Sequence, residues 1–359
     1  MAYEARGQYD VAVVGGGPAG SVAAMRIARL GWKTVLVEGD ADQPRYGETL
    51  APESNPLLRQ LGLWEALQRS HPVESPGIVS YWGTDVPHQQ DFISNPHGPG
   101  WHVDRRRFDA ELRLEAERAG ATVINRLRVS HIVREQGEWR LNHIRARYLV
   151  DAAGRNGLRI DAPATREIDD CLLVQILRIS YQRSGPRDWR TVVAAAPSGW
   201  WYWSPLPDGD AIAMLFTCRE EYAGLRRLAP AECMRTAPAI CELVRSGHFA
   251  TPRWIAASSS IRKAAHGTGW IAAGDSHTSF DPLSGRGIFN ALRSASIAAD
   301  AAHAELQHGP AAVAAFEATE RQKFMDYVRQ RRLYYLLEQR WSSNPFWELR
   351  QRPTSKYTS

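Results

Sequence analysis

The sequence predicts an α/β protein with a Rossmann-like domain, an antiparallel-sheet domain and a C-terminal helical region. A glycine-rich strand–turn–helix–strand pattern over residues 9–38 predicts the first domain. Strand-like runs over residues 171–181 and 191–217 predict the sheet. Apolar residues at helical spacing beyond residue 298 predict the helices. At 359 residues, 44% of them hydrophobic, the chain is long enough to bury a large core.

The first element, residues 9–38, has the pattern of a dinucleotide-binding turn. Val11 to Val14 form a β-branched strand, and Gly15, Gly17 and Gly20 fill the G-x-G-x-x-G spacing before an alanine-rich helix. Glycines permit the tight turn and a close approach of the backbone to a pyrophosphate, which the helix N-terminus attracts. Glu38 ends the second strand, where its carboxylate can bind ribose hydroxyls.

Residues at the ends of strands later in the chain indicate which dinucleotide is bound. The segments 101–121, 147–155 and 269–292 each combine a strand with polar or glycine-rich residues at its end. Asp275 follows an apolar strand and could hold polyol hydroxyls, while Gly285 and Gly287 open a helix that could approach a ring carbonyl. A ribityl chain and an isoalloxazine ring need such contacts and a nicotinamide does not, so the expected cofactor is FAD.

These segments resemble the FAD-dependent monooxygenases of the para-hydroxybenzoate hydroxylase fold, in their halogenase-like branch. The pattern V-x-R-x-x-F-D-x-x-L at residues 103–112 implies that Arg105 lies along the flavin phosphates and ribityl chain. The stretch G-D-S-H at residues 274–277 resembles the family's G-D-x-x-H motif with one residue fewer, and implies that Asp275 binds ribityl hydroxyls, with Pro282 beside the flavin ring. Arg45 and Glu48, in RYGETL, are expected to fix the loop that crosses the flavin.

Two further segments, GETLAP and SSNPFWELR, resemble a smaller group, the LodB-like flavoproteins that mature quinone cofactors in oxidases. The resemblance implies three regions. A discontinuous Rossmann-like FAD-binding domain comprises residues 1–74, 101–165 and 256–297. An antiparallel-sheet substrate domain comprises residues 75–100 and 166–255, and a C-terminal helical region comprises residues 298–359.

In that last region we expect five side chains to pack against the first domain rather than to bind a partner: Phe316, Phe324, Tyr327, Tyr334 and Leu337.

Both residues that the resemblance assigns to halogenation are replaced here. Halogenases carry a lysine just before the strand end that corresponds to residues 75–83, and this chain has lysine only at positions 33, 263, 323 and 356. Their glutamate in the flavin-side loop corresponds to Ser284, and a hydroxyl cannot take over the role of a carboxylate in proton transfer. The W-x-W-x-I-P signature is also broken in GWWYWSPLP. Tryptophan halogenation is therefore the least favoured activity.

The run GWWYWSPLP supplies candidate substrate-binding residues. In a strand, Trp200 and Tyr202 point to one face while Trp201 and Trp203 point to the other. We expect Trp200, Tyr202 and Pro282 to line the pocket. The candidates for proton transfer in catalysis are His277, Tyr202 and Asp281, although His277 could instead be structural and Asp281 could cap the following helix.

The leading hypothesis is an FAD-dependent monooxygenase that hydroxylates an aromatic ring. The LodB-like resemblance implies a peptidyl tryptophan that is modified while a quinone cofactor forms in a partner oxidase. Electrons would come from NAD(P)H or a separate reductase, because no second G-x-G-x-x-G is present. The alternatives are an FAD-dependent dehydrogenase or reductase of a small molecule, and a non-catalytic flavoprotein that binds a partner oxidase.

The charge, the cysteines and the apolar runs of the chain limit the kinds of partner that we expect it to bind. Residues 321–352 contain eight Lys or Arg and three Asp or Glu, a difference of +5 that equals the net charge of the chain. These charges form either a solvated helical face or a surface for an acidic partner, and they match no nucleic-acid module. The four cysteines lack metal-ligand spacing, and no apolar run reaches membrane-spanning length. We therefore expect a cytoplasmic protein without a metal and without nucleic-acid or membrane binding.

Overall fold

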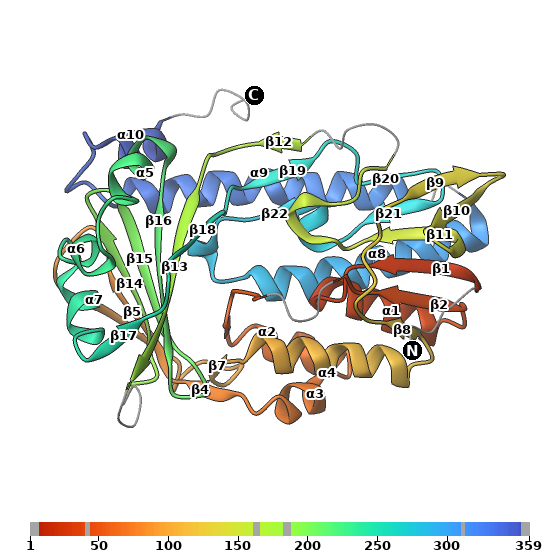
Figure 1. The fold of residues 1–359 in the computed structure, drawn as a ribbon, viewed down its shortest axis with the longest axis horizontal. Coiled ribbons are helices and arrows are strands. Elements are labelled where there is room, and N and C mark those ends of the chain that lie inside the picture. Colours follow the sequence, from red (N-terminus) through yellow and green to blue (C-terminus); the bar gives the residue numbers. More distant parts are fainter. Residues whose placement is uncertain (1–6, 40–43, 161–165, 182–187, 310–312, 353–359) are drawn as a thin grey trace.

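The computed structural model describes residues 7–39, 44–160, 166–181, 188–309 and 313–352. The ends of two expected segments, residues 161–165 and 353–359, lie outside the described residues. Figure 1 shows two large sheets at opposite ends of the molecule, with a long C-terminal helix running across both. The predicted fold class is confirmed: a Rossmann-like domain, a largely antiparallel sheet and C-terminal helices.

The first sheet has a parallel centre in the order β21(Trp270–Ala272), β11(Ile144–Asp151), β1(Gln8–Val14), β2(Thr34–Val37), β8(Thr122–Ile124). β20(His266–Gly267) and the hairpin β9(Ile132–Glu135)–β10(Glu138–Leu141) extend it by antiparallel pairing. In this register Val14 pairs with both Asp151 and Val37. Because these strands end together, the residues that follow them share one edge, where ligands bind in such folds.

Three helices pack against this sheet: α1(Pro18–Arg29), α4(Arg105–Arg118) and α8(Gly287–His308). Small buried residues such as Ala23, Ala295 and Ala298 allow α1 and α8 to approach closely. Two short helices, α2(Ser54–Gln60) and α3(Trp64–Arg69), follow the first βαβ unit. This core fixes where α1 and α8 begin, and both begin at the ligand-binding edge.

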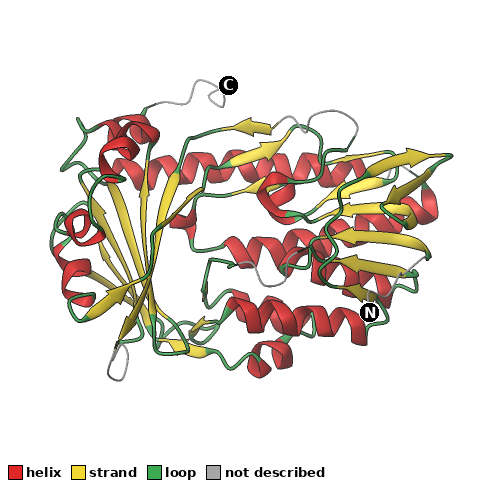
Figure 2. Cartoon of the chain, in the orientation of Figure 1, coloured by secondary structure: helices red, strands yellow, loops and turns green. Residues whose placement is uncertain are grey.

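The second large sheet has the order β17(Gly247–Phe249), β13(Leu173–Tyr181), β16(Ala211–Thr217), β15(Gly199–Pro205), β14(Thr191–Ala196), β5(Gly77–Tyr81), β6(His88–Asp91). β18(Arg253–Ala256) also pairs with β13. All pairs are antiparallel except β14 with β5. Figure 2 shows short helices on its outer side, which are α5(Arg219–Leu225), α6(Pro230–Met234) and α7(Pro238–Leu243).

Two small sheets join the large ones. One contains β3(Thr49–Leu50), β7(Gly100–His102) and β4(Val73–Ser75), so the expected domain boundaries at 74/75 and 100/101 fall inside paired strands. The other contains β12(Arg166–Ile168), β19(Ser260–Arg262) and β22(Thr278–Ser279). The 3-10 turns η1(Gly154–Asn156), η2(Gly274–Ser276) and η3(Pro282–Ser284) lie in the loops that follow the strands of the first domain. The chain thus crosses between the two regions several times.

The C-terminal region consists of α9(Ala314–Leu336) and α10(Pro345–Gln351). Phe316, Phe324 and Tyr327 pack inward as expected. Tyr334 and Leu337 do not: they are 61% and 62% exposed, and Tyr335 is the buried residue of that turn. The sequence expectation placed the buried stripe one residue too early there, because YY offers two adjacent candidates. Within the described segments, no helix is long and apolar enough to span a membrane.

Candidate active site

The turn between β1 and α1 is shaped by close backbone contacts. Gly15 has φ +108°, and a Cβ there would lie 2.2 Å from the Ala152 carbonyl oxygen. A Cβ at Gly20 would lie 1.7 Å from the Gly15 carbonyl oxygen, so only glycine fits either position. Gly17 is the N-cap of α1, and no side chain of the described residues caps this helix. Its N-terminus therefore keeps backbone N–H groups available for an anion.

A charged cluster lies beside this turn. Glu38 accepts hydrogen bonds from the Gly16 amide (2.6 Å) and from Arg45 (2.7 Å). Arg45 also contacts Asp109 at 3.2 Å, and Arg105 makes two bonds of 3.1 Å to the same carboxylate. Arg113 joins them with a 2.9 Å bond to the Gly16 carbonyl. Three guanidinium groups thus surround two carboxylates, which leaves an excess of positive charge where a pyrophosphate would lie.

The other expected cofactor residues lie on the facing loops. Asp275 on η2 is partly exposed and forms a 3.3 Å ion pair with Arg155. Its negative charge also helps to raise the pKa of Arg105. Gly285 has φ +61°, and Gly287 opens α8. A Cβ at either glycine would meet no described atom within 4 Å, so this helix N-terminus faces open space. The excess positive charge, two uncapped helix N-termini and a strand-end carboxylate together fit the phosphates, ring and ribityl chain of FAD.

The aromatic strand β15 presents different surroundings on its two faces. Trp201 and Trp203 are buried among Met234, Ile240 and other residues of the outer helices. Trp200 and Tyr202 point to the inner face, in a cluster that includes Tyr46 and Leu283. Trp200 is only 1% exposed, because its ring stacks on Phe216 with centroids 4.0 Å apart. Tyr202 is partly exposed and is the more accessible of the pair.

A polar cluster that the sequence analysis missed surrounds Tyr202. The Tyr202 hydroxyl lies 3.2 Å from Thr49 Oγ1 on β3. Next to it, the buried His102 on β7 lies 3.0 Å from Ser204 Oγ through Nδ1 and donates from Nε2 to the Trp189 carbonyl at 2.6 Å. Burial lowers the pKa of His102 to about 4, so its ring is neutral at physiological pH. The only sequence signal was a histidine next to Val103 in the flavin motif.

Glu48 lies immediately before β3 and is 5% exposed. Its Oε2 has no hydrogen-bond partner among the described residues. Burial, opposed in part by the charge of Arg105, raises the pKa of Glu48 to about 7. This carboxyl therefore changes its protonation state within the physiological range, which is unusual for glutamate.

Asp281 and Trp200 meet at the C-terminal helix α9. The Tyr335 hydroxyl accepts a hydrogen bond from Trp200 Nε1 at 3.0 Å and donates one to Asp281 Oδ2 at 2.8 Å. Asp281 Oδ1 accepts from the Leu283 amide and so caps η3, while Arg350 of α10 approaches at 3.7 Å. Burial raises the pKa of Asp281, and Arg350 opposes this shift. The C-terminal helices thereby hold the loop that contains Pro282.

His277 lies elsewhere. It is buried, with Nδ1 3.1 Å from Thr278 Oγ1 and its ring 5.7 Å from that of Phe316. Burial, with Arg166 and Arg262 nearby, lowers its pKa to about 3. Phe316 and Tyr335 are 19 residues apart on α9, which is about 28 Å along the helix axis. The imidazole of His277 and the carboxylate of Asp281 thus face distant parts of α9.

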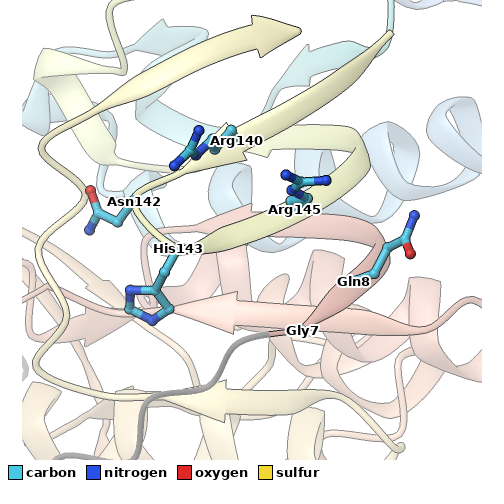
Figure 3. A pocket seen from close by; sticks show the side chains of 6 residues that line it. All are labelled: Gly7, Gln8, Arg140, Asn142, His143 and Arg145. Atoms are coloured by element: carbon cyan, nitrogen blue, oxygen red, sulfur yellow. The ribbon is translucent and has the colours of Figure 1, made fainter. Parts of the chain in front are cut away.

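Two surface hollows contain none of the predicted site residues. The first, about 470 Å³, lies at the amino end of β1 and the β10–β11 turn (Figure 3). It is about 20 Å along β1 from the glycine turn and contains none of the predicted site residues. The second, about 450 Å³, is lined by Glu74, Pro76, Asp188 and Trp189. Since the Trp189 carbonyl binds His102, this hollow borders the polar cluster around Tyr202.

The fold and the site define an FAD-dependent oxidoreductase. The chain belongs to the family described as FAD binding domain, whose model matches residues 8–288. It is 26% identical to the FAD-dependent oxidoreductase LodB of Marinomonas mediterranea over 95% of this chain and 96% of LodB. It is 27% identical to tryptophan 2-halogenase of Chondromyces crocatus over 80% of this chain but only 60% of the halogenase.

The chain is also similar to a solved structure, that of the peptidyl tryptophan dihydroxylase QhpG, which is essential for tryptophylquinone cofactor biogenesis. The TM-score is 0.78, and the sequences are 25% identical. The match covers 96% of this chain and 79% of QhpG.

Proposed function

We propose that this protein is an FAD-dependent monooxygenase that hydroxylates an aromatic ring, and that the ring is a tryptophan side chain within a peptide or partner protein. The observation that carries this proposal is Ser284, an exposed residue in the flavin-side loop where halogenases carry their glutamate. With no lysine in residues 75–83 either, neither halogenation group is present. Hydroxylation needs neither group.

Each part of the site has a role in this reaction. Gly15, Gly17, Gly20, Glu38, Arg45 and Arg105 would hold the nucleotide and phosphates, and Asp275, Gly285 and Gly287 the ribityl chain and ring. The cofactor, reduced by NAD(P)H or a separate reductase, supplies the chemistry of reduced flavin with oxygen. The buried rings of Trp200 and Phe216 exclude water from one side of the pocket. Tyr202 offers a hydroxyl that can orient the substrate ring.

The relatives support the peptidyl form of the substrate. The similarity to LodB and to QhpG extends over nearly the whole chain, and QhpG acts on a peptidyl tryptophan. A hollow of about 450 Å³ beside Trp189 borders the polar cluster around Tyr202. We infer that the substrate approaches through this hollow toward Tyr202.

Mass spectrometry of peptides incubated with the purified protein tests the proposal. The reaction contains FAD, a reductant, isotopically labelled oxygen and a tryptophan-containing peptide, with chloride and bromide present. We expect one or two labelled oxygen atoms on the tryptophan and no halogen. Halogenated tryptophan, or oxygen consumption without labelled product, would contradict the proposal and favour halogenation or a dehydrogenase, respectively. A matched peptide with leucine in place of tryptophan is the control.

A further inference from the structure

The strand β6 is an open edge of the second large sheet. Among the described strands it pairs only with β5, and all four of its side chains, His88 to Asp91, are exposed. It contains no lysine or proline, the residues by which many proteins protect such an edge. An open edge of this kind can accept one more strand from another chain.

The hydrogen bonds of β6 show which of its backbone groups face away from β5. The Phe92 amide donates to the Pro76 carbonyl at 2.8 Å, so Phe92 directs its backbone groups toward β5. The Gln90 carbonyl points the same way, since a Cβ added at position 77 of β5 would lie 2.4 Å from its oxygen. Because backbone groups alternate in direction along an antiparallel strand, Gln89 and Asp91 turn their N–H and C=O groups outward. These groups are available to an added strand.

Two exposed apolar side chains flank β6. Val86 precedes the strand and is 70% exposed, and Ile93 follows it and is 97% exposed. Both are β-branched, and such side chains pack well against the neighbours of a pleated surface. Burial of these two side chains against an added strand would therefore stabilise the pairing.

The Asp91 end of β6 leads to the hollow beside Trp189. Asp91 pairs with Gly77 of β5, and the residue before Gly77, Pro76, lines the hollow. Trp189 also lines it, and the Trp189 carbonyl accepts a hydrogen bond from His102 of the polar cluster. A chain that leaves β6 at this end therefore reaches a hollow that borders the proposed substrate site.

Carboxylates predominate at this end of β6. Glu74, Asp91 and Asp188 are exposed, and Glu74 and Asp188 line the hollow. Asp188 forms a 2.6 Å ion pair with Arg190, but Glu74 and Asp91 have no ion pair among the described residues. A segment with lysine or arginine beside its tryptophan would complement these two charges, whereas a segment with acidic residues there would be repelled.

We propose that β6 and the hollow beside Trp189 form the docking surface for an extended, basic segment of the partner protein. The segment pairs with β6 as an additional strand, covers Val86 and Ile93, and brings its tryptophan to the hollow. This inference rests on the proposed function, because modification of a tryptophan within a partner protein requires recognition of the chain around that tryptophan. The backbone pairing supplies affinity for an extended segment, and Glu74 and Asp91 select a basic one.

Binding of labelled peptides to the FAD-bound protein tests this surface without turnover. The two probes are peptides of about ten residues with a central tryptophan, flanked by lysines in one and by glutamates in the other. Fluorescence anisotropy measures their dissociation constants, and we expect the lysine peptide to bind more tightly. The double variant Glu74→Gln, Asp91→Asn should raise its dissociation constant about threefold to tenfold, and Glu117→Gln, an exposed carboxylate on α4, is the control. Equal affinity for the two peptides, or an unchanged dissociation constant in the double variant, overturns the proposal.

The second test concerns the pairing with β6. Gln89→Pro removes an outward N–H and no hydrogen bond to β5, so it should weaken binding of the lysine peptide about threefold to tenfold. Gln89→Ala keeps this N–H and should weaken binding less. In the unaltered protein, the peptide should slow hydrogen exchange of the Gln89 and Asp91 amides but not of the amides of β17, at the opposite edge of the sheet. Unchanged exchange along β6 contradicts the proposal. A dimer of the FAD-bound protein that Gln89→Pro dissociates would also contradict it, because a second copy would then occupy the edge.

Turnover separates this proposal from the proposed function. Hydroxylation of the lysine peptide should show a raised KM and little change in kcat in the double variant Glu74→Gln, Asp91→Asn. Binding of the lysine peptide at β6 without hydroxylation would support the docking surface and contradict the proposed function. Hydroxylation with a KM that neither the double variant nor Gln89→Pro changes would support the proposed function and contradict the docking surface.

Discussion

The Tyr335 hydroxyl donates a 2.8 Å hydrogen bond to Asp281 Oδ2, and this bond joins a C-terminal helix to the loop beside the expected flavin ring. The same hydroxyl accepts from Trp200 Nε1 at 3.0 Å. One phenol therefore joins the sheet that contains β15, the loop before η3 and α9. Both partners are buried, so losing the hydroxyl leaves two polar groups without compensation from water.

Replacing Tyr335 with phenylalanine removes this hydroxyl and keeps the ring. We expect the free energy of unfolding to fall by about 1–3 kcal/mol, because Asp281 and the Trp200 indole each lose a buried hydrogen bond. Chemical denaturation of the purified protein measures this. Tyr334→Phe is the matched control, since Tyr334 is 61% exposed and should change stability little. Equal stabilities of the two variants would show that the bond contributes nothing.

The two faces of β15 give a second prediction from one matched pair. Trp201→Phe should lower stability by about 1–3 kcal/mol, because it leaves a space among the outer helices, but turnover should persist. Trp200→Phe should lower turnover more, because it releases the Tyr335 hydroxyl beside the pocket. Denaturation and product formation are measured for each variant. If Trp201→Phe lost turnover while Trp200→Phe kept it, the pocket would lie on the other face.

Arg105 gives a prediction about cofactor affinity. Arg105→Met removes a charge and two bonds to Asp109, and leaves that carboxylate beside the phosphate position. We expect the dissociation constant for FAD to rise about tenfold to hundredfold, which corresponds to one charged hydrogen bond. Quenching of flavin fluorescence measures it. Arg107→Met, an exposed residue two positions later, should bind FAD normally. Unchanged affinity in Arg105→Met would place the phosphates elsewhere.

Glu48 should also make stability depend on pH. Its folded-state pKa is about 7 and its ordinary value is 4.5, so the folded protein holds this proton more tightly than the unfolded chain does. The contribution of Glu48 is therefore fully favourable below about pH 4.5 and is lost as pH rises through about 7. Relative to Glu48→Gln, the flavin-free protein should lose about 3 kcal/mol across this range. A difference that does not vary with pH would contradict the shifted pKa.

The local parts of the site could be predicted from the sequence, because their signals lie within a few residues. Gly20 is required by a contact inside one turn, Gly15 has a positive φ that glycine adopts readily, and Glu38 lies at the end of the adjacent strand. The alternation of β15 likewise follows from strand geometry alone, and the structure places Trp200 and Trp201 on opposite faces.

The remaining contacts join segments that are far apart in the chain. His102 reaches Ser204 across 102 residues, and Tyr335 reaches Asp281 across 54. No periodicity predicts such pairs, since the first depends on how β7 docks against β15 and the second on how α9 docks against the loop before η3. The sequence also could not show which of the adjacent Tyr334 and Tyr335 is buried, because either residue can belong to the buried stripe of a helix. The structure buries Tyr335.

The long helix α9 has a consequence for how the protein is made. Its first turns contact His277 through Phe316, and its last turns hold Asp281 and Trp200 through Tyr335. Phe316 and Tyr335 leave the ribosome after His277, Asp281 and Trp200. A nascent chain can therefore form the glycine turn and its arginine cluster well before Tyr335 binds Trp200 and Asp281. The expected flavin site is therefore completed in stages, the glycine turn first and the loops of Asp275 and Gly285 later, before α9 fixes their surroundings.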